Sequence, residues 1–161
     1  NYKILQKNTQ QYGNIKVFKI GLGSKNGSFK VFLSDDSENF GGVSFYSEGE
    51  GNKTESYTEC KVRNINDVIQ ELNISSIDLM KIDTEGSEYD ILSCLNDEIL
   101  RSIFWITGEL HGNRDFELLN YLNSMGFSIS VKKLIDNRLF MFNAGKEEII
   151  SQLSRKEIKI L

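Results

Sequence analysis

Acidic residues and the single histidine of this chain follow two apolar segments that have the pattern of buried strands. Asp83 and Glu85 come directly after the first segment, and Glu109 and His111 come at the end of the second. An unperturbed pKa near ~6.5 makes His111 the best candidate for a general base, and Glu109, two residues earlier on an extended strand end, would share its side. Asp83 and Glu85 can orient substrate hydroxyls or a positively charged donor. These residues therefore predict a site for proton transfer or for binding a cation.

Each of these side chains also has a purely structural interpretation. His111 can be a surface or capping residue, and Asp83 can cap the next helix through nearby amides. Glu88 is expected to complement the positive end of that helix rather than to act in catalysis. Lys81 is expected to pair with Asp83 or Glu109, or to extend its stem along apolar surface. Carboxylates with an imidazole also suit a divalent cation, although we assign no metal ligand from the sequence.

The elements that must position these residues are strands alternating with helices. Residues 77–82 form a nearly continuous apolar run, as in a parallel strand covered on both faces, and Asp83 falls at its carboxyl end, where open α/β sheets bind ligands. Helical periodicity covers residues 88–95 and 114–125, on either side of a second buried strand at residues 103–108. This alternation predicts an α/β fold with a mostly parallel sheet.

The remaining segments complete the expected order of elements. The patterns predict a helix over residues 2–12 that ends at Gly13, followed by a hairpin of strands 15–22 and 28–33 that turns at Asn26-Gly27. A short strand at 59–63 and a helix capped by Asn66 come next. The chain is predicted to close with antiparallel strands at 127–132 and 139–142 and a helix over 147–159. Residues 34–58 are predicted to be a long loop, either a solvated excursion or a substrate lid.

Composition limits the class of protein. A chain of 161 residues is expected to be a single domain, residues 1–161. A formal net charge of -4 without a basic tract disfavours nucleic-acid partners and leaves a small neutral or sugar-like acceptor as the easier fit. No apolar run approaches the ~20 residues of a membrane span. Cys60 and Cys94 are expected to be reduced structural thiols in a cytoplasmic protein.

The motif Asp78-Leu79-Met80-Lys81-Ile82-Asp83-Thr84-Glu85-Gly86-Ser87-Glu88, followed by Ile91-Leu92, resembles the hallmark of the FkbM family of S-adenosylmethionine-dependent methyltransferases. Other parts of the chain are similar to the family as well. The stretch from Gly21 to Gly27 looks like the segment after the family's third strand, residues 66–69 resemble its short helix before the hallmark, and Glu109-Leu110-His111 resembles the pair that ends its fifth strand. The resemblance covers nearly the whole chain.

The resemblance implies a Rossmann-like class I methyltransferase sheet, mostly parallel and closed by an antiparallel C-terminal hairpin. It implies S-adenosylmethionine as the cofactor, with Asp83, Glu85, Gly21 and Leu22 on the cofactor side and with His111, Glu109 and Asp83 as catalytic residues. The sequence departs from the family at the glycine-rich turn after the first strand and at the acidic residue ending the second, since both are absent. We therefore expect an N-terminally truncated fragment whose missing unit would need roughly 30 or more residues upstream of Asn1.

Three functions fit these observations. The first is a methyltransferase that acts on a sugar or polyketide-like hydroxyl. The second is a truncated, non-catalytic methyltransferase-like module that binds an acceptor but no cofactor. The third is a metal-dependent hydrolase that uses Asp83, Glu85, Glu109 and His111. The oligomeric state is left open.

Overall fold

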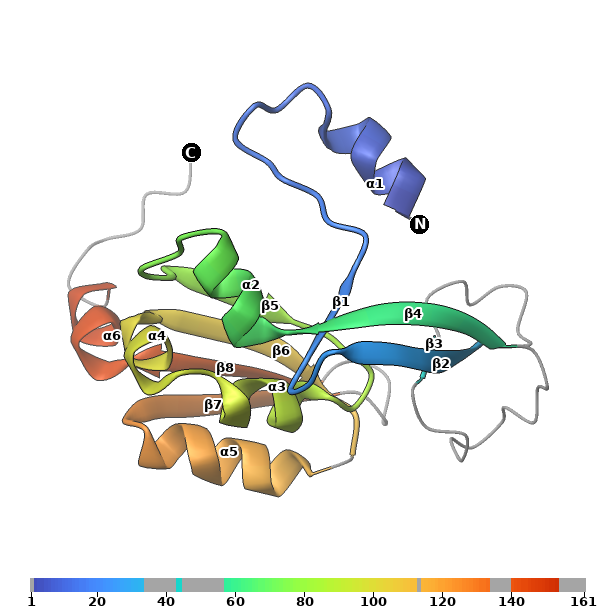
Figure 1. The fold of residues 1–161 in the computed structure, drawn as a ribbon. Coiled ribbons are helices and arrows are strands. Elements are labelled where there is room, and N and C mark those ends of the chain that lie inside the picture. Colours follow the sequence, from blue (N-terminus) through green and yellow to red (C-terminus); the bar gives the residue numbers. More distant parts are fainter. Residues whose placement is uncertain (1, 34–42, 45–56, 113, 134–139, 154–161) are drawn as a thin grey trace.

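Two four-stranded sheets and six helices make up the described part of the computed structural model, which covers residues 2–33, 43–44, 57–112, 114–133 and 140–153 (Figure 1). In chain order the elements are α1 (Tyr2–Thr9), β1 (Gly21–Gly23), β2 (Gly27–Leu33), β3 (Val43–Ser44), β4 (Tyr57–Asn64), α2 (Ile65–Glu71), β5 (Leu79–Ile82), α3 (Glu88–Cys94), α4 (Asp97–Ser102), β6 (Trp105–Leu110), α5 (Asp115–Ser124), β7 (Phe127–Lys133), β8 (Phe140–Lys146) and α6 (Glu147–Leu153).

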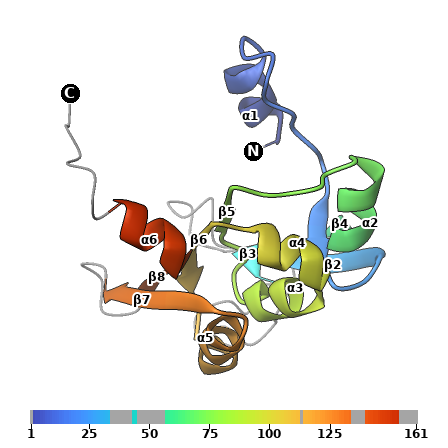
Figure 2. The same cartoon turned by 90° about the vertical axis from the view of Figure 1, so that its left-hand side faces the viewer.

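The sheet that carries the candidate site has the strand order β5-β6-β8-β7. β5 and β6 are parallel, and β8 lies antiparallel between β6 and β7, which confirms the predicted closing hairpin. Figure 2 shows α3, α4 and α5 on one side of this sheet and α6 on the other. The hydrophobic core lies between the sheet and the first group of helices, where Leu92, Leu100, Ile106, Leu122 and Phe142 are fully buried.

The other sheet has the order β1-β4-β2-β3, and it corrects the predicted hairpin of residues 15–22 and 28–33. β1 and β2 do not pair with each other, because β4 lies between them, parallel to β1 and antiparallel to β2. The missing side chain of Gly23 explains this close packing, since a Cβ there would come within 2.7 Å of Val62 in β4. The loop after β1 is also tied to β4, where the backbone amide of Asn64 donates to the side chain of Asn26 (2.9 Å).

The expectation of a mostly parallel sheet is wrong for the described residues. Two strand pairings are parallel, β1 with β4 and β5 with β6, and the other four are antiparallel. A parallel pair needs a crossover connection of a dozen or more residues. The segment from β5 to β6 supplies one through α3 and α4, and the segment from β1 to β4 contains β2 and β3. β4 pairs antiparallel with β2, and β8 pairs antiparallel with β7.

Several element boundaries differ from the sequence-based expectations. The N-cap of α2 is Asn64 rather than Asn66, and its side chain accepts from the Asn66 amide (2.8 Å). Asn66 instead joins two later elements, donating to the Cys94 carbonyl and accepting from the Asn96 amide. The short helix α4 was not predicted; Asn96 caps it.

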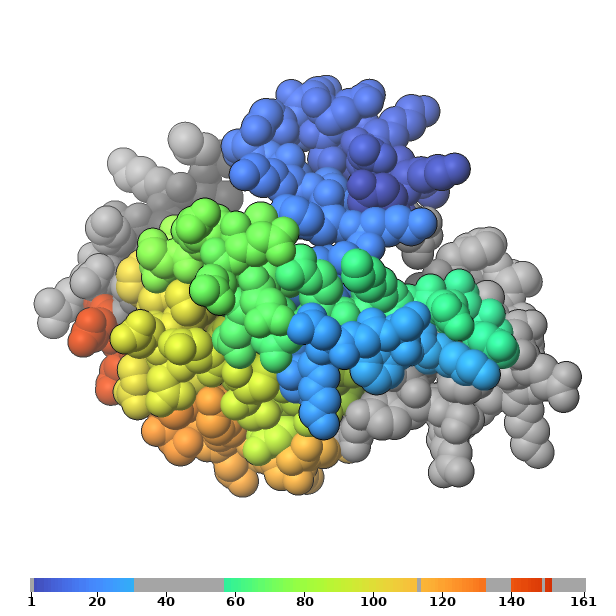
Figure 3. All heavy atoms as spheres, viewed as in Figure 1, coloured from blue at the N-terminus to red at the C-terminus, as the bar shows by residue number. Residues whose placement is uncertain are grey.

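The two ends of the chain also differ from the sequence-based expectations. α1 ends at Thr9, before the predicted Gly13, and it has no buried residue. Figure 3 shows the N-terminal segment as a separate lobe on the surface beside α2. The predicted loop at 34–58, the turn at 136–137 and the end of the last helix lie largely outside the described residues. Within the part of the chain that is described, none of the helices has the length and apolarity needed to span a membrane.

Candidate active site

The site lies where the neighbouring parallel strands β5 and β6 end. Their register places Ile82 opposite Gly108, so Asp83 and Glu109, the next residue of each segment, lie beside each other. Gly108 permits this spacing, because a Cβ at that position would be 2.6 Å from the Ile82 carbonyl oxygen. His111 follows directly after β6. The strand ends therefore bring together the acidic residues and the histidine, as predicted.

The turn between β5 and α3 has an unusual backbone. Glu85 has a φ of 53° and Gly86 a φ of 104°, so two successive residues adopt conformations with positive φ. For the glycine this costs little, but for a residue with a side chain the left-handed region costs about 1–2 kcal/mol. Surrounding contacts must hold Glu85 in place, and such strain is often found at functional sites.

Glu88 supplies those contacts from the first turn of α3. Its Oε1 accepts hydrogen bonds from the amide (2.8 Å) and hydroxyl (3.1 Å) of Thr84, and its Oε2 accepts one from the amide of Gly86 (3.0 Å). The residue is only 2% exposed. Glu88 was expected to be a simple partner of the helix dipole, but the structure gives it the additional task of holding the turn.

Glu88 also holds His111. The Nδ1 atom of His111 lies 3.1 Å from Glu88 Oε1. An ionised carboxylate can only accept, so the imidazole donates through Nδ1 and directs Nε2 away from Glu88. The carboxylate oxygens nearest to Nε2 belong to Glu85 (3.5 Å), Asp83 (3.8 Å) and Glu109 (3.9 Å). One imidazole nitrogen thus faces three carboxylates from the ends of two strands.

The electrostatics follow from this crowding. The hydrogen bond that His111 donates to Glu88 raises the pKa of His111 despite its burial, and the charges of Glu88, Glu85 and Asp83 add to the effect. Burial alone would raise the pKa of Glu88, but the hydrogen bonds from His111 and from Thr84 outweigh it and lower the pKa. The pKa of Glu85 is raised by burial and by the charges of Asp83 and Glu109. The site therefore favours a positive charge at its centre.

A cavity of about 330 Å³ opens beside the carboxyl end of β5. Its wall is formed by Leu22, Ile65, Met80, Ile82 and Ile91, and its polar side by Lys81, Asp83 and Thr84. Lys81 Nζ contacts Asp83 Oδ2 (3.1 Å), which confirms the predicted ion pair. Asp83 therefore lies both in the wall of the cavity and in the carboxylate cluster.

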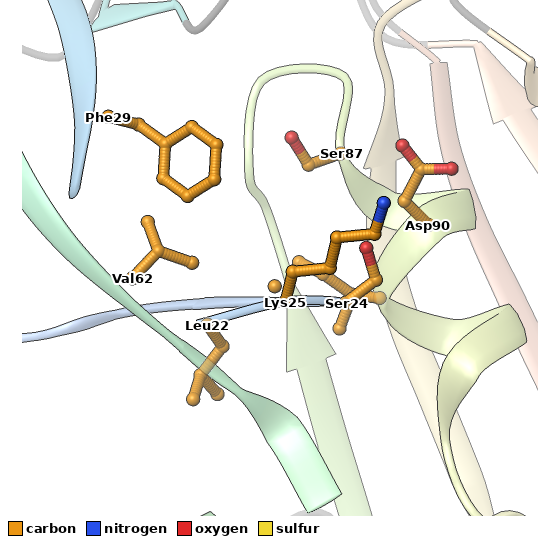
Figure 4. A pocket seen from close by; sticks show the side chains of 9 residues that line it. Leu22, Ser24, Lys25, Phe29, Val62, Ser87 and Asp90 are labelled. Carbon is orange, nitrogen blue, oxygen red and sulfur yellow. The ribbon is translucent and has the colours of Figure 1, made fainter. Parts of the chain in front are cut away.

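A second cavity, of about 250 Å³, is lined by residues of β1, β2, β4 and α3. Figure 4 shows its lining, in which Phe29 and Val62 lie across from the polar side chains of Lys25, Ser87 and Asp90. Leu22 lines both cavities and connects β1 with the site.

The structure thus brings most of the predicted site residues together. Asp83, Glu85, Glu109 and His111 form one cluster, and Leu22 lines the adjoining cavity. Gly21 is not among the residues lining the described cavities, and its Cα faces Val62 and Cys60 of β4.

Sequence reasoning missed the part that Glu88 plays. A carboxylate in the first helical turn after a tight turn can reach back to the amides of that turn, and this position was the available signal.

Comparisons with known proteins agree with the placement of the motif. The family model described as "Methyltransferase FkbM domain" matches residues 1–129. A curated relative, the AMB antimetabolite synthetase AmbE of Pseudomonas aeruginosa, is 35% identical over 81 residues, and the match covers 46% of this chain. The match spans only 4% of that relative's length. No solved structure matches the chain.

Proposed function

The chain belongs to the family of FkbM methyltransferase domains, and from that premise we propose that it transfers a methyl group from S-adenosylmethionine to a hydroxyl group of a sugar or polyketide-like acceptor. The position of Asp83 is the observation that carries this proposal. Its carboxylate lines the cavity beside β5 and also lies 3.8 Å from Nε2 of His111. A donor in the cavity and an acceptor at the cluster would therefore be neighbours.

The residues of the cavity fit the chemical character of the cofactor. S-adenosylmethionine supplies, when bound, a methyl group on a positively charged sulfur. The apolar wall that includes Leu22 and Met80 suits the uncharged parts of such a molecule, and Asp83 on the polar side suits its positive charge. Glu85 adds a second carboxylate in the adjoining cluster. The placement of Gly21 beside the cofactor stays a prediction. The segment from Gly21 to Gly23 leads into the strand β2 and not into a helix, as the sequence indicated.

The cluster of His111, Glu109 and Asp83 suits the acceptor. These three side chains can hold a hydroxyl group by hydrogen bonds and take up the proton that it loses as its oxygen is methylated. Glu88 fixes the orientation of the imidazole through Nδ1, so Nε2 faces the place where the hydroxyl would lie. The roles of the three residues are proposals based on this placement.

The class of acceptor is proposed from the chemistry and from the relative. The relative is named as a synthetase of an antimetabolite, which is consistent with an acceptor that is a small molecule or an intermediate of its assembly. An acceptor rich in hydroxyl groups would also match the acidic cluster, because carboxylates accept hydrogen bonds from hydroxyls. A glycan shares this chemistry.

The experiment that tests this function is a transfer assay with S-adenosylmethionine that carries an isotopic label on its methyl group. Hydroxylated small molecules and glycans are offered as acceptors, and products are identified by mass spectrometry. We expect an O-methyl product, and a rate at least about 100-fold lower for His111→Gln, the usual scale of general acid-base catalysis. Glu117→Gln, an exposed residue of α5, is the matched control. Methylation at nitrogen alone would contradict the assignment to hydroxyls.

Two alternatives predict other results. A non-catalytic module would fold but would bind no cofactor, so S-adenosylhomocysteine would leave its melting temperature unchanged. A metal-dependent hydrolase would use the same cluster, but membership of the family favours methyl transfer over hydrolysis.

A further inference from the structure

The spacing of the cluster suits a metal ion better than it suits hydrogen bonds. One ligand atom each from Asp83, Glu109 and His111 lies within 4.8 Å of the others. The distances of 3.5–3.9 Å from Nε2 to the carboxylates exceed the usual hydrogen-bond range of about 2.7–3.2 Å. Ligands around a divalent ion with bonds of about 2.1 Å are roughly 3.0–3.4 Å apart. To close around such an ion, Asp83 and Glu109 would have to come closer to Nε2 than the present 3.8 Å and 3.9 Å, by roughly 0.4–0.9 Å.

The second observation concerns the imidazole of His111. The side chain of His111 is nine-tenths buried, and its Nε2 has no hydrogen-bond partner within the described part of the chain although it points into the cluster. Its other nitrogen is held by the buried carboxylate of Glu88. Histidines that bind metals usually donate their second N–H to a carboxylate in this way, which fixes the tautomer and leaves the other lone pair for the ion.

The two oxygens of the Asp83 carboxylate have different neighbours. Its Oδ2 is paired with Lys81, whereas its Oδ1 is the atom that faces Nε2 of His111. Glu85 adds a further carboxylate beside the cluster. An ion at the centre would neutralise charges that otherwise repel one another.

We propose that Asp83, Glu109 and His111 bind a divalent metal ion that accepts both oxygen and imidazole ligands, such as Mn²⁺ or Zn²⁺. This proposal extends the proposed function, because an ion there would lower the pKa of a hydroxyl bound next to it. Binding of the ion itself requires no cofactor. With the ion bound, His111, Asp83 and Glu109 would serve as ligands, and the proton of the hydroxyl would pass to Glu85, the carboxylate beside the cluster that would not bind the metal.

The test begins with calorimetry on the 161-residue chain, purified without a histidine tag and treated with EDTA. Titration with Mn²⁺ is expected to show one site. Asp83→Asn and Glu109→Gln should each weaken binding at least tenfold, and Glu88→Gln should weaken it about 10–100-fold by releasing the imidazole. Glu117→Gln, which removes an exposed carboxylate of α5 that pairs with Arg114 and not with the cluster, should bind like the wild type. Equal affinity in Asp83→Asn and Glu117→Gln, or no binding at all, would overturn the proposal.

Nuclear magnetic resonance provides a readout that stays informative if a variant fails to fold. The chain has one histidine, so the imidazole nitrogens give a single pair of signals. Added Zn²⁺ should shift the Nε2 signal, saturate at one equivalent and leave Nδ1 protonated. Unchanged imidazole signals in the folded wild type would reject the site.

Binding of S-adenosylhomocysteine in EDTA is measured separately. Cofactor binding without ion binding would reject only the metal site, and the reverse result would reject only the methyltransferase assignment.

Discussion

The carboxylate of Glu88 contacts two parts of the site at once, the 84–86 turn and the imidazole of His111. A glutamine at this position keeps one oxygen but places an amide nitrogen against backbone N–H groups. We therefore expect Glu88→Gln to lower the free energy of unfolding by about 1–3 kcal/mol, the scale for leaving buried hydrogen-bonding groups unsatisfied. Urea denaturation measures this loss.

The matched control for Glu88→Gln is Asp90→Asn in the same helix. Asp90 is exposed and pairs with Arg114 on the surface, so its loss should cost less than about 1 kcal/mol. Equal losses in the two variants would show that Glu88 does not hold the turn.

Glu85 offers a prediction about pH. Its pKa is raised in the folded protein, so the folded state binds this proton more tightly than the unfolded state does. Ionised Glu85 therefore destabilises the fold above its raised pKa. The destabilisation fades as the pH falls from the raised pKa toward the ordinary value of about 4.3, and it is absent below that value. In EDTA, Glu85→Gln should raise the melting temperature at neutral pH and change it little near pH 4. A gain of the same size at both pH values would contradict the electrostatic explanation.

At this scale the sequence predicted which residues meet but not how they are held. Asp83, Glu109 and His111 could be placed together because each follows a recognisable buried strand. The pairing of Glu88 with His111 could not be predicted, because it depends on the positive φ of Glu85 and Gly86, which turns the amides of the 84–86 segment toward α3.

At the scale of elements, the contact between β5 and β6 sets the distance between Asp83 and Glu109. Gly108→Ala would place a Cβ 2.6 Å from both the Ile82 carbonyl oxygen and the Phe142 ring, and the backbone cannot yield without separating the strands. We expect a loss of roughly 1–3 kcal/mol in stability, measured by urea denaturation, together with weaker binding at the cluster. Gly13→Ala, which meets open space, should show neither effect.

The sequence predicted some of the helices and strands and missed others. The core strands and α5 were recognised from long apolar patterns, whereas α4 has only six residues, too few for a periodic pattern to be read. The Asn-Gly pair favoured a hairpin between β1 and β2, but local turn chemistry cannot show that a strand from farther along the chain, β4, pairs with both.

At the scale of the whole molecule, the site depends on both sheets. Leu22 of β1 and Ile65, the residue after β4, help to line the cavity that reaches Asp83 of the second sheet. We propose on this basis that residues 1–161 act as a single domain, and we expect one cooperative unfolding transition by calorimetry. Two separate transitions would contradict it. A cytoplasmic location stays a prediction.

The most direct test of the methyltransferase assignment is calorimetric titration of the protein with S-adenosylhomocysteine in EDTA, for the wild type and for Asp83→Asn. The proposed site predicts a single binding site in the wild type and at least tenfold weaker binding in Asp83→Asn, because this carboxylate lies in the cavity wall. A folded wild-type protein that binds no S-adenosylhomocysteine, or an Asp83→Asn variant that binds it equally well, would contradict the account.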